Sequence, residues 1–269
     1  MTTGAEPMNR ALVPCEIHDG VATVTLHNPP LNVVTVGLIA ALGEVLDALH
    51  CDTAVRAVVL TGAGGKAFCA GSDIHEFHGL MAPGQVVPRK LRRQNEVFFQ
   101  LDRFAKPTVA AVSGLAYGGG LEIALCCDLI VADDSARFAL PEVALGVFPS
   151  SGGPMRVARR IGEGRAKELM LLGDPIDAAT ALAWGLVNRV VPADELLPQA
   201  RALARDMLSV IPSMLVSYKR VIDDGYAASF GEGMRIERER ADAANGGVRA
   251  EDIEQRREAV RARAHSQRG

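Results

Sequence analysis

Hydrophobic and polar positions in the first sixty residues predict two strands, a helix and a third strand. Residues 15–26 alternate between apolar and polar side chains around Asp19-Gly20, which predicts a β-hairpin with a tight turn. Apolar residues from 38 to 49 recur at helical spacing, and residues 56–60, with the sequence RAVVL, are typical of a buried strand. Because a strand, a helix and a strand in this order make a crossover unit, the chain is predicted to have an α/β fold.

The most informative stretch covers residues 107–131, with the sequence PTVAAVSGLAYGGGLEIALCCDLIV. It predicts a buried strand at 108–112, a glycine turn at 118–120, a helix that begins at Leu121, and an apolar return at 129–131. Glycines let the backbone approach a ligand closely, and the start of a helix offers unpaired N–H groups and the positive end of its dipole. The pattern is therefore typical of an anion site.

Two glutamates close to this stretch are candidates for catalysis. Glu122 lies in the first turn of the predicted helix, where it either complements the helix dipole or serves as a catalytic carboxylate. Glu142 follows Pro141 at the end of a short apolar strand, and its apolar neighbours predict a partly desolvated carboxyl group with a raised pKa. The two interpretations of Glu122 stay open at this level of evidence.

The C-terminal part of the chain is predicted to be helical. Helical patterning with charged outer faces is present at 196–210 and at 236–244. Pro212 and Gly225 are loop signals between these two segments.

Composition places the chain among ordinary globular proteins, with 269 residues of which 48% are hydrophobic and 23% charged. That length supports one sizeable core and a smaller appendage. The first ten residues lack the features of a signal peptide, and no apolar run reaches the roughly 18 residues that a bilayer span needs, so we expect a cytoplasmic protein. A net charge of −3 and an aromatic content of 4% argue against general nucleic-acid binding.

Several residues of types that often bind metals or nucleotides do not indicate such a site here. The glycine-rich loop at 61–77 fits neither spacing of the common nucleotide-binding motifs. His75 and His78 have the spacing of a metal pair, but no cluster of further ligands lies near them in sequence, so no metal site is expected. The five cysteines form neither an even framework nor a C-x-x-C pair and are predicted to be reduced core thiols; they are Cys15, Cys51, Cys69, Cys126 and Cys127.

Four sequence blocks carry a family resemblance: FCAGSDIHEF (68–77), KPTVAAVSGLAYGGGLEIALCCDLIVA (106–132), FALPEVALGVFPSSGG (138–153) and AKELMLLGDPIDAATALAWGLVNRVVP (166–192). In their order and spacing they resemble the enoyl-CoA hydratase/isomerase, or crotonase, superfamily, and the resemblance covers about residues 14 to 264.

The resemblance implies a domain plan for the whole chain. It predicts an N-terminal tail at 1–13, a crotonase-like ββα spiral core at 14–194, and a C-terminal helical domain at 195–269. In such proteins the helical domain covers the pocket and supports homotrimers or dimers of trimers.

The motifs are most similar to those of enoyl-CoA hydratases with two glutamates. The resemblance implies that the peptide N–H groups of Ser72 and Gly119 form an oxyanion hole for a thioester. Glu122 would help deprotonate the water that attacks C3, and Glu142 would deliver a proton to C2. The implied reaction is reversible syn hydration of a trans-2-enoyl-CoA to a 3-hydroxyacyl-CoA.

The resemblance also implies where coenzyme A binds. Lys66 would reach the nucleotide phosphates, the Ala70 carbonyl would meet the adenine, and Leu31 would line the adenine pocket. A basic run at Arg89, Lys90, Arg92 and Arg93 is either a solvated face or an attractor for the anionic ligand. The implied coenzyme A positions are Leu31, Lys66, Ala70, Ser72, Asp73, Ile74 and Gly119. No cofactor is implied beyond the coenzyme A moiety of the substrate.

Three positions depart from the family pattern. Ser150 stands where a glycine amide usually helps to seat the water, and Tyr117 precedes the glycines where a smaller or aliphatic residue is commoner. Tyr117 would narrow the acyl pocket, donate its hydroxyl to a functionalised substrate, or be a core tyrosine. Arg263 falls near an expected lysine in a C-terminal tail that lacks the usual family pattern.

Other functions stay open beside hydration. One class is another acyl-CoA enzyme of the same fold, such as an enoyl-CoA isomerase, or a lyase or hydrolase that cleaves a C–S bond or a ring. A second class is a non-catalytic relative that binds acyl-CoA or RNA. The presence of both Glu122 and Glu142 favours hydration over an isomerase. The intact set of Ser72, Gly119, Glu122 and Glu142 argues against a relative without catalysis.

Overall fold

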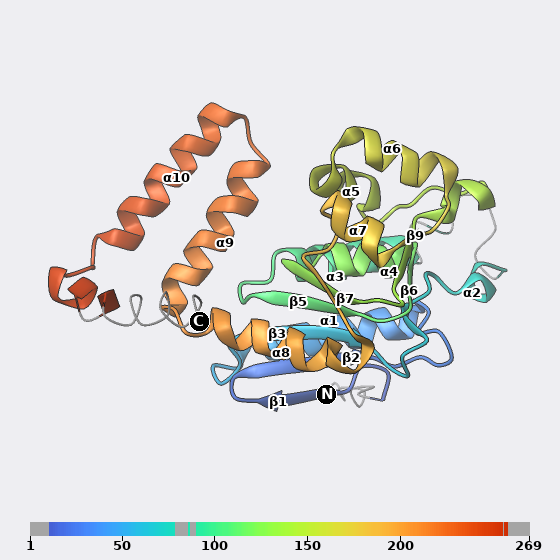
Figure 1. The fold of residues 1–269 in the computed structure, drawn as a ribbon, viewed down its shortest axis with the longest axis horizontal. Helices are drawn as coiled ribbons and strands as arrows, with labels where there is room; N and C mark the ends of the chain where they lie inside the picture. Colours follow the sequence, from blue (N-terminus) through green and yellow to red (C-terminus); the bar gives the residue numbers. More distant parts are fainter. Residues whose placement is uncertain (1–10, 79–85, 87–89, 255, 258–269) are drawn as a thin grey trace, which may run out of the picture. The chain divides into compact units, whose positions relative to one another are not determined.

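The structure is a computed structural model that describes residues 11–78, 86, 90–254 and 256–257 (Figure 1). The chain divides into two units, Met1–Ser209 and Val210–Gly269.

The first unit begins with the predicted hairpin and crossover. Strand β1 (Cys15–His18) pairs antiparallel with β2 (Val21–Leu26), and both turn residues between them have positive φ, 51° at Asp19 and 79° at Gly20. Helix α1 (Val36–Cys51) then leads to β3 (Ala57–Gly62), which lies parallel to β2. The hairpin, the helix and the crossover unit are thus confirmed.

From β3 onward the chain winds through two sheets in a repeating order. Three consecutive strand pairs each have their first strand in one sheet and their second strand in the other; they are β3 and β4, β5 and β6, and β7 and β8. The larger sheet has the order β1-β2-β3-β5-β7-β10, and the smaller has the order β4-β6-β8-β9. The remaining strands are β4 (Ala67–Cys69), β5 (Thr108–Val112), β6 (Leu115–Tyr117), β7 (Leu129–Asp133), β8 (Arg137–Ala139), β9 (Ile176–Asp177) and β10 (Arg189–Val191).

Helices follow each strand pair and complete the spiral (Figure 1). After β4 come α2 (Ile74–His78) and α3 (Arg92–Asp102), and after β6 comes α4 (Gly119–Leu125). After β8 come a 3₁₀ turn, η2 (Pro141–Leu145), and the helices α5 (Gly153–Ile161), α6 (Glu163–Leu172) and α7 (Ala178–Trp184). Helix α4 begins two residues before the predicted Leu121, because its first turn includes Gly119 and Gly120.

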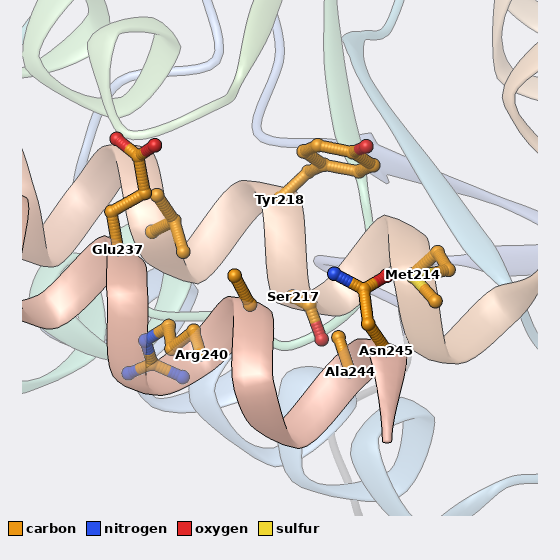
Figure 2. A pocket seen from close by; sticks show the side chains of 9 residues that line it. Met214, Ser217, Tyr218, Glu237, Arg240, Ala244 and Asn245 are labelled. Atoms are coloured by element: carbon orange, nitrogen blue, oxygen red, sulfur yellow. The ribbon is translucent and has the colours of Figure 1, made fainter. Parts of the chain in front are cut away.

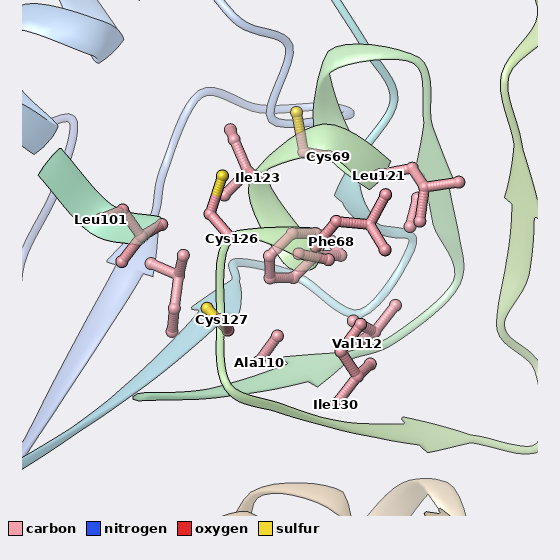
Figure 3. Close-up of a cluster of buried hydrophobic side chains, with 14 of the residues drawn as sticks. Phe68, Cys69, Leu101, Ala110, Val112, Leu121, Ile123, Cys126, Cys127 and Ile130 are labelled. Atoms are coloured by element: carbon pink, nitrogen blue, oxygen red, sulfur yellow. The ribbon is translucent and has the colours of Figure 1, made fainter. Parts of the chain in front are cut away.

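The central strands of the larger sheet are apolar on both faces because both faces are covered. Val58, Ala110 and Ile130 face the main core, which also contains α1, α3 and α4. Figure 3 shows Phe68 within this core, near Leu121 and Ile123. The alternate residues Ala57, Val59, Val109, Ala111 and Val131 belong to a second cluster on the other face.

Helix α8 (Leu196–Met207) covers that other face. Its buried side chains Leu196, Ala200 and Ala204 pack in the second cluster with the strand residues. For this reason the first unit continues to Ser209, whereas the domain plan places α8 with the C-terminal helices and divides the chain at 194/195.

The second unit is a pair of adjacent helices, α9 (Pro212–Tyr226) and α10 (Phe230–Asn245). Pro212 begins α9 at a position where its missing N–H costs nothing, and Gly225 lies in the last turn, so the two loop signals mark the ends of a helix. A groove of about 390 Å³ lies between the two helices. Figure 2 shows side chains that line it, among them Met214, Tyr218 and Arg240. Neither helix contains a buried residue.

The cysteines divide into two groups, so the prediction of five core thiols is wrong for two of them. Cys69, Cys126 and Cys127 are buried, and burial raises the pKa of the Cys69 thiol to about 12. Cys15 and Cys51 are exposed, because β1 is an edge strand and Cys51 ends α1. Among the described residues, no helix has the length and apolar composition that crossing a bilayer requires.

Candidate active site

Three parallel strands deliver the candidate residues to one edge of the smaller sheet. Strands β4, β6 and β8 are parallel neighbours, so the residues that follow them lie at the same edge. Ser72 follows β4, Gly119 follows β6, and Glu142 follows β8. Segments far apart in the sequence therefore converge where ligands of α/β proteins usually bind.

Val34 holds the segment after β4. Its N–H donates to the Gly71 carbonyl at 2.8 Å, and its carbonyl accepts from the Asp73 N–H at 3.0 Å, so Ser72 faces Val34 in a parallel bridge. In such a bridge the two neighbours of Ser72 make the hydrogen bonds, and the N–H of Ser72 itself points to the opposite side. That N–H is therefore directed away from Val34.

The glycine turn brings Gly119 beside Ser72. Gly118 has a left-handed φ of 49° and donates its N–H to the Ala139 carbonyl at 2.9 Å. Gly119 is the first residue of α4, so its N–H has no partner within the helix. A Cβ atom placed on Gly119 would lie 3.6 Å from the Ser72 Oγ atom. The two residues that the resemblance assigns to the oxyanion hole are thus neighbours.

Glu122 is almost fully buried, with 2% of its surface exposed. Its Oε1 atom accepts hydrogen bonds from the N–H groups of Ser151 and Gly153, each at 2.9 Å. Burial raises the pKa of Glu122, and the two backbone hydrogen bonds and the charge of Arg156 oppose that rise. The carboxyl group is therefore fixed in position, with its pKa displaced above the ordinary value.

Glu142 lies in the first turn of η2, and its carboxyl group sits over Gly118. A Cβ atom on Gly118 would lie only 2.7 Å from the Glu142 Oε1 atom, so glycine leaves room for this carboxyl group. The Oε2 atom is buried and has no hydrogen-bond partner among the described residues. Burial raises the pKa of Glu142, its own backbone N–H opposes the rise, and the charge of Glu122 adds to it. The two carboxyl groups are thus electrostatically coupled.

Arg156 supports the turn that binds Glu122. Its Nη1 atom donates to the Ser151 carbonyl at 2.7 Å, and its Nε atom donates to Asp102 Oδ1 at 3.0 Å. The guanidinium therefore ties α5 to α3 and places a positive charge close to the Glu122 carboxylate.

The coenzyme A positions implied by the resemblance lie in two adjoining loops. The Ala70 N–H donates to the Leu31 carbonyl at 3.0 Å, so these two residues are side by side. Lys66 is exposed in the turn before β4. Asp73 accepts from the His75 N–H through Oδ1 at 2.8 Å, and 60% of the Ile74 surface is exposed. Their contacts with coenzyme A stay predictions.

Lys90 has a structural role instead of a place in an exposed basic run. It is buried, and its Nζ atom donates to Glu76 at 2.7 Å and to the Val34 carbonyl at 3.3 Å. A buried ion pair of this kind holds α2 near Val34, so Lys90 is not available to attract an anion. Arg89 and Arg263 lie outside the described residues. In the described part of the chain, no group of three or more His, Cys, Asp or Glu side chains is arranged to hold a metal ion.

Gln94 and Ser151 are site residues that motif spacing does not reveal. Gln94 is buried on α3, and its Nε2 atom donates to the Ser151 Oγ atom at 2.7 Å. A polar residue within the apolar stripe of the 92–102 segment is the one signal that could have found it. Ser150 donates through Oγ to the Phe148 carbonyl at 2.8 Å, and its part in seating water stays a prediction, as does the role of Tyr117.

A comparison with known protein families identifies the fold and its relatives. The model of the enoyl-CoA hydratase/isomerase family matches residues 16–243. The chain belongs to this family. It is 38% identical to the short-chain-enoyl-CoA hydratase of Clostridium acetobutylicum over 221 residues, which is 81% of this chain and 84% of that protein. The family resemblance of the four sequence blocks is thus confirmed.

Two further relatives of this hydratase/isomerase chain agree. The crotonyl-CoA hydratase of Syntrophomonas wolfei is 34% identical, with 82% of this chain and 85% of that protein covered. The crystal structure of an enoyl-CoA hydratase from Bacillus anthracis matches with a TM-score of 0.87 at 30% identity. The match covers 93% of this chain and 96% of the Bacillus anthracis chain. The predicted crotonase fold is therefore confirmed.

Proposed function

We propose that this chain is an enoyl-CoA hydratase, which adds water reversibly to the C2=C3 double bond of a trans-2-enoyl-CoA. The observation that carries the proposal is the coupled pair of carboxyl groups, Glu122 and Glu142, at the edge of the smaller sheet. Addition of water needs one group that accepts a proton and one that donates a proton. The names of the relatives, enoyl-CoA and crotonyl-CoA hydratases, support the same reaction.

The thioester oxygen is bound by the backbone of Ser72 and Gly119. As water attacks, negative charge develops on this oxygen, and two preorganised N–H groups stabilise that charge more than they stabilise the ground state. The bridge between Val34 and Ser72 and the start of α4 support this assignment, because both fix the backbone before the substrate arrives.

The two carboxyl groups divide the proton transfers. Ionised Glu122 accepts a proton from the water while the water oxygen bonds to C3, and the electrons of the double bond move toward C2 and the thioester oxygen. Protonated Glu142 then delivers its proton to C2, and solvent restores both groups before the next turnover. The raised pKa of Glu142 supports its role as the acid, because it keeps the proton at higher pH than an ordinary carboxyl group.

Coenzyme A lies, in this proposal, along the loops that contain Leu31 and Ala70. The hydrogen bond between these loops supports a single adenine pocket. Lys66 is exposed in the turn before β4 and is assigned to the phosphates. Asp73 and Ile74 complete the set from the start of α2, next to Ser72.

Hydration of crotonyl-CoA tests the proposed reaction. Purified protein should remove the absorbance of the conjugated enoyl thioester, with a kcat of about 1–10³ s⁻¹, and yield 3-hydroxybutyryl-CoA on chromatography. Folded protein that leaves crotonyl-CoA and longer 2-enoyl-CoAs unchanged would contradict hydration. If a 3-enoyl-CoA were converted to a 2-enoyl-CoA instead, the isomerase alternative would replace it.

We also propose that the protein assembles into homotrimers or dimers of trimers in the cytoplasm. Large apolar side chains are exposed after Glu142, such as Leu145 and Phe148, and on the helices of the second unit, such as Phe230. Light scattering should give at least three times the mass of one chain, and the mass of a monomer would contradict the assembly.

The free, exposed thiol of Cys51 supports a reducing compartment, which cell fractionation would test.

A further inference from the structure

Gln94 is a polar side chain at a position built for an apolar one. Helix α3 turns one face toward the core with Val97, Phe98 and Leu101, and Gln94 continues that face with only 3% of its surface exposed. Burying an amide is unfavourable unless both of its ends find hydrogen-bond partners. A leucine here would complete the stripe without that cost.

Only one end of the Gln94 amide is bonded within the described residues. Nε2 donates to Ser151 Oγ at 2.7 Å, while Oε1 is buried and has no partner in the described part of the chain. A half-turn of the amide exchanges its donor and acceptor ends, but one end would still face Ser151 and the other would still lack a partner. The unpartnered end can therefore form a hydrogen bond with a ligand group that is both a donor and an acceptor.

The location of the Gln94 amide connects it to the reaction. Its bonded Nε2 atom lies 3.9 Å from the position of a Cβ on Gly119, and the unpartnered Oε1 belongs to the same amide group. Ser151 in turn donates its N–H to the Glu122 carboxylate. Gln94 and Ser151 thus span the distance between the proposed oxyanion donor and the proposed base. In the proposed binding mode, an acyl chain whose thioester is held on Gly119 and which passes Glu122 runs beside this pair.

We infer that Gln94, anchored by Ser151, binds a hydroxyl group on the acyl chain close to the reacting carbons, and so selects hydroxylated enoyl-CoA substrates. A hydroxyl both donates and accepts a hydrogen bond, so it matches either orientation of the amide. An apolar acyl chain leaves the buried amide unsatisfied, which lowers its transition-state binding relative to the hydroxylated chain. This inference rests on the proposed function, because it takes the acyl chain to be seated between Gly119 and Glu122.

The test compares crotonyl-CoA with 4-hydroxycrotonyl-CoA in the wild type, in Gln94→Leu and in Gln100→Leu. Wild type should favour the hydroxylated substrate in kcat/KM by about tenfold to a hundredfold, and Gln94→Leu should lose that preference. Gln100→Leu makes the same change on α3 at a residue bonded to Asp47, away from the site, and should keep the preference.

Two results of the kinetic comparison would overturn the inference. One is a wild type without preference between the two substrates. The other is a Gln94→Leu variant that loses kcat/KM equally on both substrates, because Gln94 would then act only by holding Ser151 and Glu122.

Binding of saturated analogues separates this inference from the proposed reaction. Calorimetry with wild type should show 4-hydroxybutyryl-CoA bound about tenfold or more tighter than butyryl-CoA, and equal affinities would overturn the inference even if Gln94→Leu does not fold. A wild type that prefers the hydroxylated analogue but does not hydrate crotonyl-CoA would sink the proposed reaction and support the hydroxyl site.

Discussion

Glu122→Gln and Glu142→Gln are each expected to lower kcat for crotonyl-CoA hydration by about 10²- to 10⁴-fold. Glutamine has nearly the same shape as glutamate, so the new amide oxygen in the Glu122→Gln variant can still accept from the N–H groups that hold Glu122 Oε1. An amide, however, neither takes a proton from water nor gives one to carbon. The measurement is the steady-state rate of loss of the enoyl-thioester absorbance, with KM determined for each variant.

Glu163→Gln is the matched control for these two variants. Glu163 is exposed on α6 and pairs with Lys167, so the same chemical change outside the site should leave kcat at the wild-type value. If only the Glu142 variant lost activity while the Glu122 variant kept it, the two-carboxylate mechanism would be wrong. The isomerase alternative, which can work with a single carboxyl group, would then be favoured.

The pH dependence of the wild type should reflect the same two groups. Glu122 must be ionised to act as a base, and burial raises its pKa, so kcat/KM should begin to fall on the acid side at a higher pH than for an ordinary carboxyl group. Glu142 must keep its proton, and its raised pKa extends the active range upward before the alkaline decline. Because the groups are coupled, the profile reports the pair. A flat profile across the carboxyl range would contradict these roles.

Local sequence patterns predict the fold well where hydrophobic periodicity is strong. The hairpin around Asp19, the strand at 108–112 and helix α1 all follow from alternation or helical spacing. The family motifs also bring Ser72, Gly119 and Glu142 to the ends of neighbouring strands. No periodicity, however, shows that these strands are parallel neighbours, because their pairing joins segments that are separated by whole helices in the chain.

Side-chain partners were harder to predict than elements. Lys90 lies in a run of basic residues, and only the fold reveals that Glu76 and the Val34 carbonyl satisfy it in the interior. The amphipathic pattern of α8 is equally consistent with a helix of a separate C-terminal domain. In the structure, however, its small residues Ala200 and Ala204 pack on the larger sheet of the first unit. In both cases the sequence pattern shows which positions are basic or amphipathic. Only the fold shows which residues these side chains contact.

The three consecutive glycines are suited to their positions for different physical reasons, and the sequence alone does not distinguish these reasons. Gly118 has a left-handed φ and makes room for Glu142, whereas a Cβ atom on Gly119 would meet only ordinary van der Waals neighbours. Gly120 is the most constrained of the three. A Cβ atom on it would lie 1.9 Å from the Cys69 carbonyl oxygen, and that oxygen belongs to the backbone of β4.

Gly120→Ala is therefore expected to destabilise the first unit by about 3 kcal/mol, because a side-chain carbon at that distance forces the backbone apart in a packed core. For a unit of this size the melting temperature should fall by about 10 °C. Any shift of Cys69 also displaces Ser72, so kcat/KM should fall in the fraction that stays folded. Thermal unfolding followed by circular dichroism, with kinetics at a temperature well below the midpoint, measures both effects.

Gly164→Ala is the control that separates the clash from the general effect of replacing glycine. Among the described residues, no atom outside the chain neighbours and the backbone of α6 itself lies within 4 Å of a Cβ on Gly164. Alanine is also the better helix former, so the melting temperature of the Gly164→Ala protein should equal or slightly exceed that of the wild type. A Gly120→Ala protein with wild-type stability and activity would mean that the end of β4 yields without cost. The position of the Ser72 N–H would then not depend on the packing of α4 against β4, and the substrate itself would have to order the oxyanion donors.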